Sequence, residues 1–239
     1  MPTFETEFLR SERLAEGTMA FHFARPAGFS FQAGQSINLG LIDPPETDAK
    51  GNRRTFSVAS APFENEIMIA TRLRDTAYKR VLKSMSPGTR VQVRGPAGKF
   101  VLESADERPA VMLAGGIGVT PFVSILRQAE HEALPRKLLL FYSNRRPEDA
   151  PFLRELMGPE RNPNYRFIGT MAEMDKSSEP WTGERGFIDR AMLARGLGDL
   201  LAPTYYIAGP PAMVDAMKKL LIEAGVAGER IRTDEFFGY

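Results

Sequence analysis

The sequence predicts two domains, an N-terminal antiparallel β-barrel and a C-terminal α/β doubly wound parallel sheet. A chain of 239 residues with 43% hydrophobic side chains is long enough to bury two ordinary cores. The apolar pattern also changes near residue 103, from short alternating segments to apolar strands that alternate with amphipathic helices. Because the charged stretch 103–109 has no apolar period, we expect one domain over 1–103 and the other over 104–239.

The barrel is predicted from six short segments in which apolar and polar residues alternate. Segments of this kind at short spacing are typical of an antiparallel barrel. One helix is expected to interrupt them at 76–85, because its apolar residues recur at helical spacing. The expected strands lie at 4–14, 18–25, 35–41, 54–60, 66–73 and 90–96.

The parallel sheet is predicted from a repeated order of apolar strand, loop and amphipathic helix. Apolar strands joined by crossover helices are buried on both faces, which is typical of a doubly wound sheet. The polar stretch 171–185 is expected to be a surface loop. The expected strands lie at 109–116, 137–144, 165–171, 204–210 and 230–236, and the expected helices at 120–133, 147–157, 187–197 and 211–225.

Composition and charge exclude several classes of function. The absence of cysteine excludes disulfides, thiolate catalysis and cysteine-ligated zinc or iron–sulfur clusters. The two histidines, His22 and His131, are too far apart in sequence to suggest a metal site, and we expect both to be partly exposed. A net charge of +1 with scattered cations provides no field for nucleic acid or an acidic membrane surface.

No membrane span is expected either. The longest uncharged stretch, 109–126, contains three glycines and an internal proline, which indicate strand, turn and helix. The first residues lack a basic start followed by an apolar block, so they do not resemble a secretory signal. We therefore expect a cytoplasmic protein that binds a small ligand.

Two glycine-rich turns indicate a nucleotide crevice. In "LAGGIGVTPF" (113–122) the glycines allow a tight turn, Thr120 can cap the next helix and Pro121 suits its first position. The amides of such a helix start, at the end of a parallel strand, can bind a pyrophosphate. An ordinary strand-to-helix turn is the alternative, since Pro121 stands where the dinucleotide fingerprint has its third glycine. A second turn, "YIAGPPAMV" (206–214), would flank the same crevice.

Four motifs resemble those of the ferredoxin–NADP reductase superfamily, in the order of that family. "RTFSVAS" (54–60) is similar to its arginine-x-tyrosine-serine flavin motif, and "DEFFGY" (234–239) to its acidic-aromatic C-terminus. "GGIGVTPF" (115–122) and "AGPPAMV" (208–214) resemble its nicotinamide-nucleotide motifs. The resemblance implies a FAD-binding barrel and an NAD(P)-binding α/β domain, as in the bacterial single-chain form without an iron–sulfur domain.

The resemblance places FAD on the fourth barrel strand and on the segments that follow. Arg54 would bind the FAD pyrophosphate, Phe56 would pack on the flavin and ribityl chain, and Ser57 would place its hydroxyl near flavin N5. The helix start at 76–79 would present amides to the pyrophosphate, although ordinary helix capping uses the same amides. The other implied FAD residues are Thr55, Ala70, Thr71, Thr76, Ala77, Tyr78 and Lys79.

The implied nucleotide residues lie in the two glycine-rich turns, and the chain departs from the family pattern at two positions. The family often has cysteine where this chain has Ala208, so a thiol contribution to nicotinamide positioning is missing. Phe56 replaces the usual tyrosine, which keeps the ring and loses a hydroxyl. The implied pyrophosphate residues are Gly116, Gly118, Thr120 and Pro121, and the implied nicotinamide residues are Gly209 and Pro210.

The resemblance also implies a proton relay and an aromatic shield in the C-terminal segment. Glu235 would relay protons near the flavin, so that Ser57 and Glu235 are the implied catalytic residues. Either Phe237 or Tyr239 would cover the flavin face. The alternative is that these aromatic rings only dock the tail on the core.

The sequence leaves the choice between NADH and NADPH open. Arg145 and Arg146 end the second strand of the parallel sheet, where an arginine could pair with a 2′-phosphate. The family's usual serine-arginine pair follows the third strand, however, and "IGTMAEMD" (168–175) has no cation there.

The implied activity is that of a flavoprotein reductase, in which hydride passes from NADH or NADPH to FAD and electrons go on to a ferredoxin, a flavodoxin or another acceptor. A reductase that binds flavin loosely is a closely related option. The alternative from another class is a non-catalytic or partner-dependent nucleotide-binding electron-transfer subunit. Seven cations could form a basic rim for a small acidic redox protein: Arg72, Arg74, Lys79, Arg80, Lys83, Arg90 and Arg94.

Overall fold

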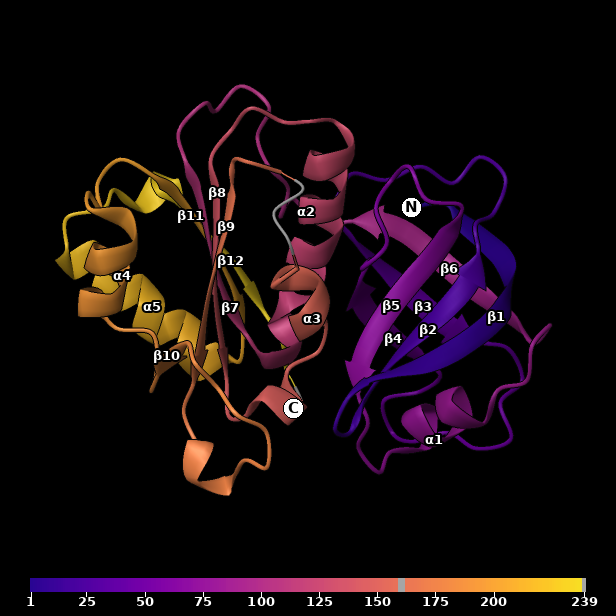
Figure 1. The fold of residues 1–239 in the computed structure, drawn as a ribbon. Coiled ribbons are helices and arrows are strands. Elements are labelled where there is room, and N and C mark those ends of the chain that lie inside the picture. The colour runs from indigo at the N-terminus through magenta and orange to yellow at the C-terminus, as the bar shows by residue number, and fades with distance from the viewer. Residues whose placement is uncertain (159–161, 238–239) are drawn as a thin grey trace. The chain divides into compact units, whose positions relative to one another are not determined.

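The chain folds into two compact units, and the computed structural model describes residues 1–158 and 162–237. One unit comprises Met1–Val101 and Thr120–Gln128, and the other comprises Leu102–Val119 and Ala129–Tyr239. Within the described residues, the first unit contains a six-stranded antiparallel sheet and the second a six-stranded parallel sheet (Figure 1). The predicted fold class is therefore confirmed.

The antiparallel sheet closes into a barrel because its two outer strands meet. Its order is β4-β3-β6-β1-β2-β5, and an antiparallel bridge between Val58 and Ile69 joins the β4 end to β5. The first part of β1 pairs with β6 and the remainder with β2. The strands are β1 (Thr3–Ala15), β2 (Thr18–Ala24), β3 (Ser36–Leu41), β4 (Arg53–Ser57), β5 (Glu66–Arg72) and β6 (Arg90–Ala97).

Alternating side chains of these strands fill the barrel, as the period of two residues predicts. Ile37 and Leu39 of β3 and Ile69 of β5 are fully buried in one hydrophobic core. Helix α1 (Ala77–Ser84) lies at one end of the barrel and adds Tyr78 to this core (Figure 1). The barrel core therefore extends from the strands to the helix that follows β5.

The parallel sheet has the order β10-β9-β8-β7-β11-β12, and every neighbouring pair runs parallel. The strand order reverses between β7 and β11, which places a topological switch point at their C-terminal ends, where ligands bind in such sheets. The strands are β7 (Ala110–Gly115), β8 (Leu138–Asn144), β9 (Tyr165–Met171), β10 (Glu184–Arg185), β11 (Thr204–Gly209) and β12 (Ile231–Glu235).

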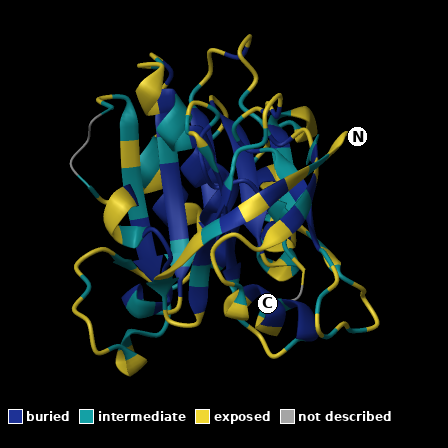
Figure 2. Ribbon diagram, turned by 90° about the vertical axis from the view of Figure 1, so that its right-hand side faces the viewer, coloured by how far each residue is buried: buried dark blue, intermediate teal, exposed yellow. Residues whose placement is uncertain are grey.

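The central strands β7 and β11 of the parallel sheet are buried along their whole length, and buried residues are dark blue in Figure 2. Helices α4 and α5 pack on one face, where Leu193 and Leu221 meet Leu113 and Ile207 of the central strands, and α3 lies on the other side (Figure 1). Short 3₁₀ turns connect several elements. The helices and turns are η1 (Gly116–Val119), α2 (Thr120–His131), η2 (Pro147–Asp149), α3 (Leu153–Leu156), η3 (Met174–Lys176), α4 (Arg190–Leu197), α5 (Pro211–Glu223) and η4 (Gly228–Arg230).

Three elements of the parallel unit differ from the prediction. The helix expected over 147–157 is two short turns, because Pro151 and the left-handed Phe152 (φ 61°) interrupt it. Part of the expected surface loop forms β10, which pairs with β9. Helix α4 begins at Arg190, because Asp189 caps it by accepting a hydrogen bond from the Met192 amide.

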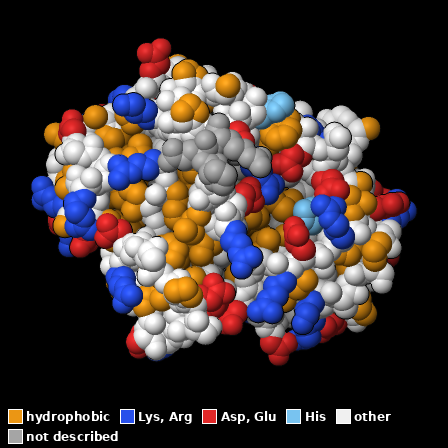
Figure 3. Space-filling model, in the orientation of Figure 1, with side chains coloured by type: hydrophobic (Ala, Val, Ile, Leu, Met, Phe, Trp, Pro, Cys, Tyr) orange, Lys and Arg blue, Asp and Glu red, His pale blue; other side chains and the backbone are white. Residues whose placement is uncertain are grey.

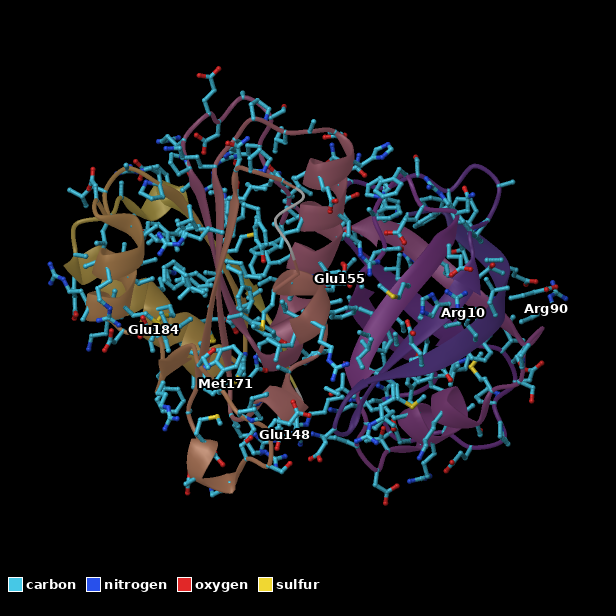
Figure 4. All side chains as sticks on the ribbon, in the orientation of Figure 1. Arg10, Arg90, Glu148, Glu155, Met171 and Glu184 are labelled. Carbon is cyan, nitrogen blue, oxygen red and sulfur yellow. The ribbon has the colours of Figure 1, made fainter. Side chains whose placement is uncertain are left out.

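His22 is buried, so the expectation of a partly exposed side chain is wrong for this residue. Only 6% of it is exposed, and its two ring nitrogens lie 3.0 Å from carboxylates of Glu12 and Glu66. Arg10 on β1, which is labelled in Figure 4, is the register partner of His22 and forms an ion pair with the same Glu66. The alternation pattern indicated the strand correctly, but it could not reveal these partners. His131 is exposed at the end of α2.

A buried ion pair closes the start of the parallel sheet. Asp106 and Arg136 each have 6% of their side chains exposed and lie 3.2 Å apart, and the Thr204 hydroxyl donates a 2.6 Å hydrogen bond to Asp106. Burial opposes ionisation, but hydrogen bonds from Thr204 and Arg108 outweigh it and lower the Asp106 pKa to about 2. Asp106 therefore connects the segment before β7 to the segment before β8 through Arg136, and to the first residue of β11 through Thr204.

No helix of the described residues is long and apolar enough to cross a membrane. The longest uncharged stretch of the sequence folds instead into β7, a 3₁₀ turn and the start of α2, as its glycines and proline predicted.

Replacing Asp106 with Ala should lower the free energy of unfolding by about 3–5 kcal/mol, because Arg136 would stay buried without a partner charge. Urea unfolding at neutral pH measures this. The Asp106 pKa is lower in the folded chain than in the unfolded one, so its contribution is present above pH 3.8 and is lost as the pH falls toward 2.

The matched control is Glu103→Gln. The Glu103 carboxylate pairs with Arg232 at a half-exposed position, and loss of such a pair should cost less than about 1 kcal/mol. Equal losses of stability in the two variants would show that the Asp106 pair does not hold the sheet.

Candidate functional site

In the barrel unit, the predicted site residues of β4 are divided between its two faces. Arg54 lies opposite Leu39 and Phe56 opposite Ile37 in the β3–β4 register, so both side chains share the face of buried core residues. Thr55 lies on the other face and is exposed.

The ring of Tyr78 connects Arg54 and Phe56 to helix α1. The Arg54 guanidinium lies 4.9 Å from the centre of the Tyr78 ring, and the Phe56 ring lies 6.0 Å from it. The Tyr78 hydroxyl donates a 3.0 Å hydrogen bond to the Leu39 carbonyl, and burial raises its pKa. The sequence predicted only a backbone role for Tyr78, and its side chain proves central to this cluster.

Arg54 is fixed by the loop that precedes it. One terminal nitrogen of its guanidinium donates hydrogen bonds of 2.7 and 3.0 Å to the Asp48 carboxylate. The other terminal nitrogen donates to the backbone carbonyls of Lys50, Gly51 and Arg53. Nothing in the sequence motif indicated Asp48. The arginine is therefore held in one orientation and keeps only 21% of its side chain exposed.

A cluster of cations surrounds the start of α1. Lys79 is half-buried and donates a 2.6 Å hydrogen bond to the Arg72 carbonyl. Burial, together with the charges of Arg74 and Arg54, lowers the Lys79 pKa to about 8. Because Asp48 already pairs with Arg54, the charges that favour an anion here are those of Lys79 and Arg74, and a diphosphate would restore the lysine charge.

The first turn of α1 adds backbone donors to this cluster. Thr76 caps the helix by accepting a hydrogen bond from the Lys79 amide, so the capping expected from the sequence is present. The amides of Ala77 and Tyr78 belong to the first turn, where no intrahelical acceptor exists. The capping hydrogen bond therefore uses the Lys79 amide and leaves the Ala77 and Tyr78 amides without an intrahelical acceptor.

The remaining flavin-motif residues are buried in the barrel. Ser57 ends β4 with 6% of its surface exposed, and Ala70 and Thr71 of β5 are 5% and 3% exposed. The Thr71 hydroxyl donates to the Arg72 carbonyl at 3.4 Å. The structure thus brings Arg54, Phe56, Tyr78 and Lys79 together, and it places Ala70 and Thr71 in the strand that leads to them.

In the parallel unit, the two glycine-rich turns pack against each other at the switch point. A Cβ atom on Gly118 would lie 2.4 Å from the Ala208 carbonyl oxygen, and one on Gly209 would lie 3.1 Å from the Gly115 amide nitrogen. Side chains at these positions would separate the turns. Gly118 is therefore required for this close packing of the backbone, and Gly209 makes it tight.

Gly116 has a different role from Gly118. Its φ of +53° is left-handed, and a Cβ atom there would meet nothing within 4 Å. It begins η1, which runs directly into α2, so the single helix start expected from the sequence is a 3₁₀ turn followed by a helix. Thr120 and Pro121 are buried in the first turn of α2.

The second turn and the C-terminal strand lie side by side. Pro210 is exposed and caps α5, next to Gly209 at the end of β11. Glu235 is the register partner of Gly209 and is exposed, so it lies beside the nicotinamide turn that the sequence predicted. Its neighbour Asp234 was not predicted; burial and the Glu235 charge raise the Asp234 pKa to about 6.

The predicted aromatic shield is only partly described. The Phe237 side chain is 74% exposed, which leaves its ring free of both cores. Tyr239 lies outside the described residues.

Comparisons with known proteins agree with this arrangement. Residues 112–219 match the family model of the oxidoreductase NAD-binding domain. The reductase subunit of glycine betaine monooxygenase from Chromohalobacter salexigens is 31% identical over 213 residues, which cover 87% of this chain and 56% of that protein. Ferredoxin–NADP reductase B from Sorangium cellulosum is 28% identical, with coverage of 98% and 97%.

Solved structures show the same fold over nearly the whole chain. A cytochrome P450 reductase of Amycolatopsis has a TM-score of 0.82 and 25% identity, and covers 98% of this chain. A ferredoxin NADP⁺ reductase from Neisseria gonorrhoeae with bound FAD and NADP has a TM-score of 0.82 and 24% identity, and covers 99% of this chain and all of its own.

Fold and sites together define a chain of two units, with a cationic cluster in the barrel unit and two packed glycine turns at the switch point of the parallel sheet. The fold is that of ferredoxin–NADP reductases, and the sequence is similar to reductases of that type. It spans about half to two thirds of the length of the first curated relatives, with coverage from 49% to 63%.

Substitutions of Gly118 and Gly116 should separate packing from binding. Gly118→Ala should lower the free energy of unfolding by about 1–3 kcal/mol, because the new methyl group overlaps the Ala208 carbonyl. Gly116→Asn should cost less than about 1 kcal/mol, since asparagine tolerates left-handed backbone, and it should weaken nucleotide binding. Urea unfolding and calorimetric titration with nucleotide measure the two effects. Unchanged affinity in Gly116→Asn would remove Gly116 from the binding site.

Proposed function

We propose that this chain is a FAD-dependent oxidoreductase that transfers hydride from a nicotinamide nucleotide to flavin and passes the electrons to an acceptor. The cation cluster at the start of α1 carries the proposal, because Lys79, Arg74 and the first-turn amides of the helix fit a diphosphate. The match to the NAD-binding family model and the glycine turns at the switch point support it. We propose 1–103 as the FAD-binding domain and 104–239 as the NAD(P)-binding domain.

Each barrel residue has a defined task in this proposal. Lys79 and the first-turn amides of α1 would bind the FAD pyrophosphate, while Arg54, held by Asp48, would set the positive potential beside it. Phe56 would support the flavin ring, and the Ser57 hydroxyl would donate to the nitrogen that receives the hydride. Bound FAD would supply the redox chemistry, accepting two electrons at once and releasing them singly or as a pair.

The residues of the parallel unit would hold and orient the nucleotide. Gly116 would allow the backbone to approach the pyrophosphate, and Gly209 and Pro210 would line the nicotinamide position. Glu235, the register partner of Gly209, would exchange protons with solvent. Phe237 would cover the flavin until the nicotinamide displaces it.

We propose a redox protein as the acceptor, because the two relatives named above are the reductase subunit of a monooxygenase and a ferredoxin–NADP reductase. The basic rim expected for such a partner is weaker than its seven cations in the sequence suggest. Arg80 pairs with Glu46 and Asp75, and Arg90 pairs with Glu5. On the face in Figure 3, cations and carboxylates are interspersed. Arg74, Lys83 and Arg94 are the exposed candidates.

Anaerobic addition of nicotinamide nucleotide to the FAD-loaded protein should bleach the blue flavin absorbance. The expected result follows from hydride transfer to the bound flavin. A protein that stays colourless after incubation with FAD and gel filtration would contradict the proposal. Retained colour that neither NADH nor NADPH bleaches would point instead to a non-catalytic electron-transfer subunit.

FAD affinity should fall as the pH rises from about 7.5 to 9.5, by up to about tenfold per pH unit. The Lys79 pKa of about 8 in the free protein means that the ammonium is lost in this range, and a bound diphosphate favours the protonated form. Fluorescence titration of FAD at several pH values measures the slope.

Lys79→Met should flatten this pH dependence. The matched control is Lys83→Met, which removes an exposed lysine from the last turn of the same helix and should keep the slope. An unchanged slope in Lys79→Met would exclude Lys79 as the phosphate ligand.

A further inference from the structure

The loops after β8 and β9 lie in one row with the glycine turn of β7. Gly115 is the register partner of Ser143, and Ser143 is the partner of Thr170 in β9. A dinucleotide with its pyrophosphate at the switch point directs its adenosine ribose toward the end of the strand next to the first one. In this sheet that strand is β8. The residues that follow β8 would therefore lie beside the ribose 2′ position, together with the loop after the neighbouring strand β9.

Carboxylates outnumber cations in these two loops. Residues 143–149 and 172–179 contain five carboxylates and three cations. A nucleotide with a 2′-phosphate would add up to about two negative charges to this edge. A nucleotide with a free 2′-hydroxyl would add none and could donate a hydrogen bond to a carboxylate.

Each of the three cations is already held by a carboxylate. Arg146 forms a two-point contact with Asp149 at 2.9 and 3.1 Å, and Arg145 contacts the same side chain at 3.2 Å. Asp149 is 5% exposed, so its charge depends on these arginines. Lys176 pairs with Glu173 at 2.9 Å. A 2′-phosphate would have to compete with these carboxylates for every cation.

The two loops also hold each other in place. The carboxylate of Glu148 accepts hydrogen bonds of 2.8 Å from the Ser177 hydroxyl and of 2.7 Å from the Ser178 amide. Arg146 donates to the Lys176 carbonyl at 3.4 Å. Glu148 and Met171, the last residue of β9, lie at the same end of the sheet (Figure 4). A rearrangement that released a cation for a phosphate would break this network.

We propose that this chain selects NADH over NADPH through the carboxylate-rich edge formed by the loops after β8 and β9. Glu173 is the residue that we assign to this discrimination. Its side chain is only partly exposed, and it follows β9, the third strand of the parallel sheet in chain order. It forms an ion pair with Lys176 and lies close to Arg145. The inference rests on the proposed function, because it concerns the nucleotide of the same crevice.

Calorimetric titration of the full chain with ADP-ribose and with 2′-phospho-ADP-ribose tests the proposal without requiring turnover. ADP-ribose should bind at least about tenfold more tightly, a difference of about 1.4 kcal/mol. Equal or tighter binding of the 2′-phosphorylated probe would overturn the proposal. In parallel, NADH should bleach the FAD-loaded protein at lower concentration than NADPH. Bleaching by neither would contradict the proposed function, and bleaching by NADPH first would contradict only this inference.

Glu173→Gln should narrow the preference between the two probes about tenfold, because it removes one charge and frees Lys176 for the phosphate. The gain should appear in the affinity for 2′-phospho-ADP-ribose and not in that for ADP-ribose. The matched control is Glu223→Gln, which removes a carboxylate paired with a lysine at the far end of α5 and should leave both affinities unchanged. A preference that stays the same in Glu173→Gln would overturn the assignment of this residue.

Discussion

The close approach of the β7 and β11 turns is the constraint on which the nucleotide site depends. The backbone of Gly118 lies against Ala208 at a distance that leaves no room for a side chain, and Gly209 lies tightly against Gly115. This contact brings the end of β7, the end of β11 and the register partner Glu235 into one edge of the sheet. The open position at Gly116 is available to a ligand because its neighbours carry the packing.

The barrel site depends on a different constraint, the burial of like charges around one aromatic ring. Tyr78 holds Arg54 through its ring and the barrel through its hydroxyl, and α1 brings Lys79 to the same place. Desolvation and repulsion together lower the lysine pKa, so the free site is electrostatically strained. An anionic cofactor would relieve this strain, and its binding would then be coupled to protonation of Lys79.

The fold was predictable because the spacing of apolar residues along the sequence follows which side chains are buried, and each unit shows one regular spacing. Strands with period two gave the barrel, and apolar strands with helical crossovers gave the parallel sheet. Errors occurred where a single residue overrides the pattern, as Phe152 does in the expected helix after β8. At the sites, motifs indicated which residues matter but not their partners. The ion pairs of Arg54 with Asp48 and of Arg146 with Asp149 depend on loop conformations, and His22 is buried by partners from other strands.

The central claim is that the chain holds a nicotinamide ring against flavin for direct hydride transfer. The most direct test reduces the FAD-loaded protein anaerobically with nucleotide that carries deuterium on one or the other face of the nicotinamide C4 atom. The account predicts that one epimer yields deuterium-free oxidised nucleotide and the other retains its deuterium fully, because only one face of a held ring can meet the flavin. Mixed products from both epimers would contradict the account.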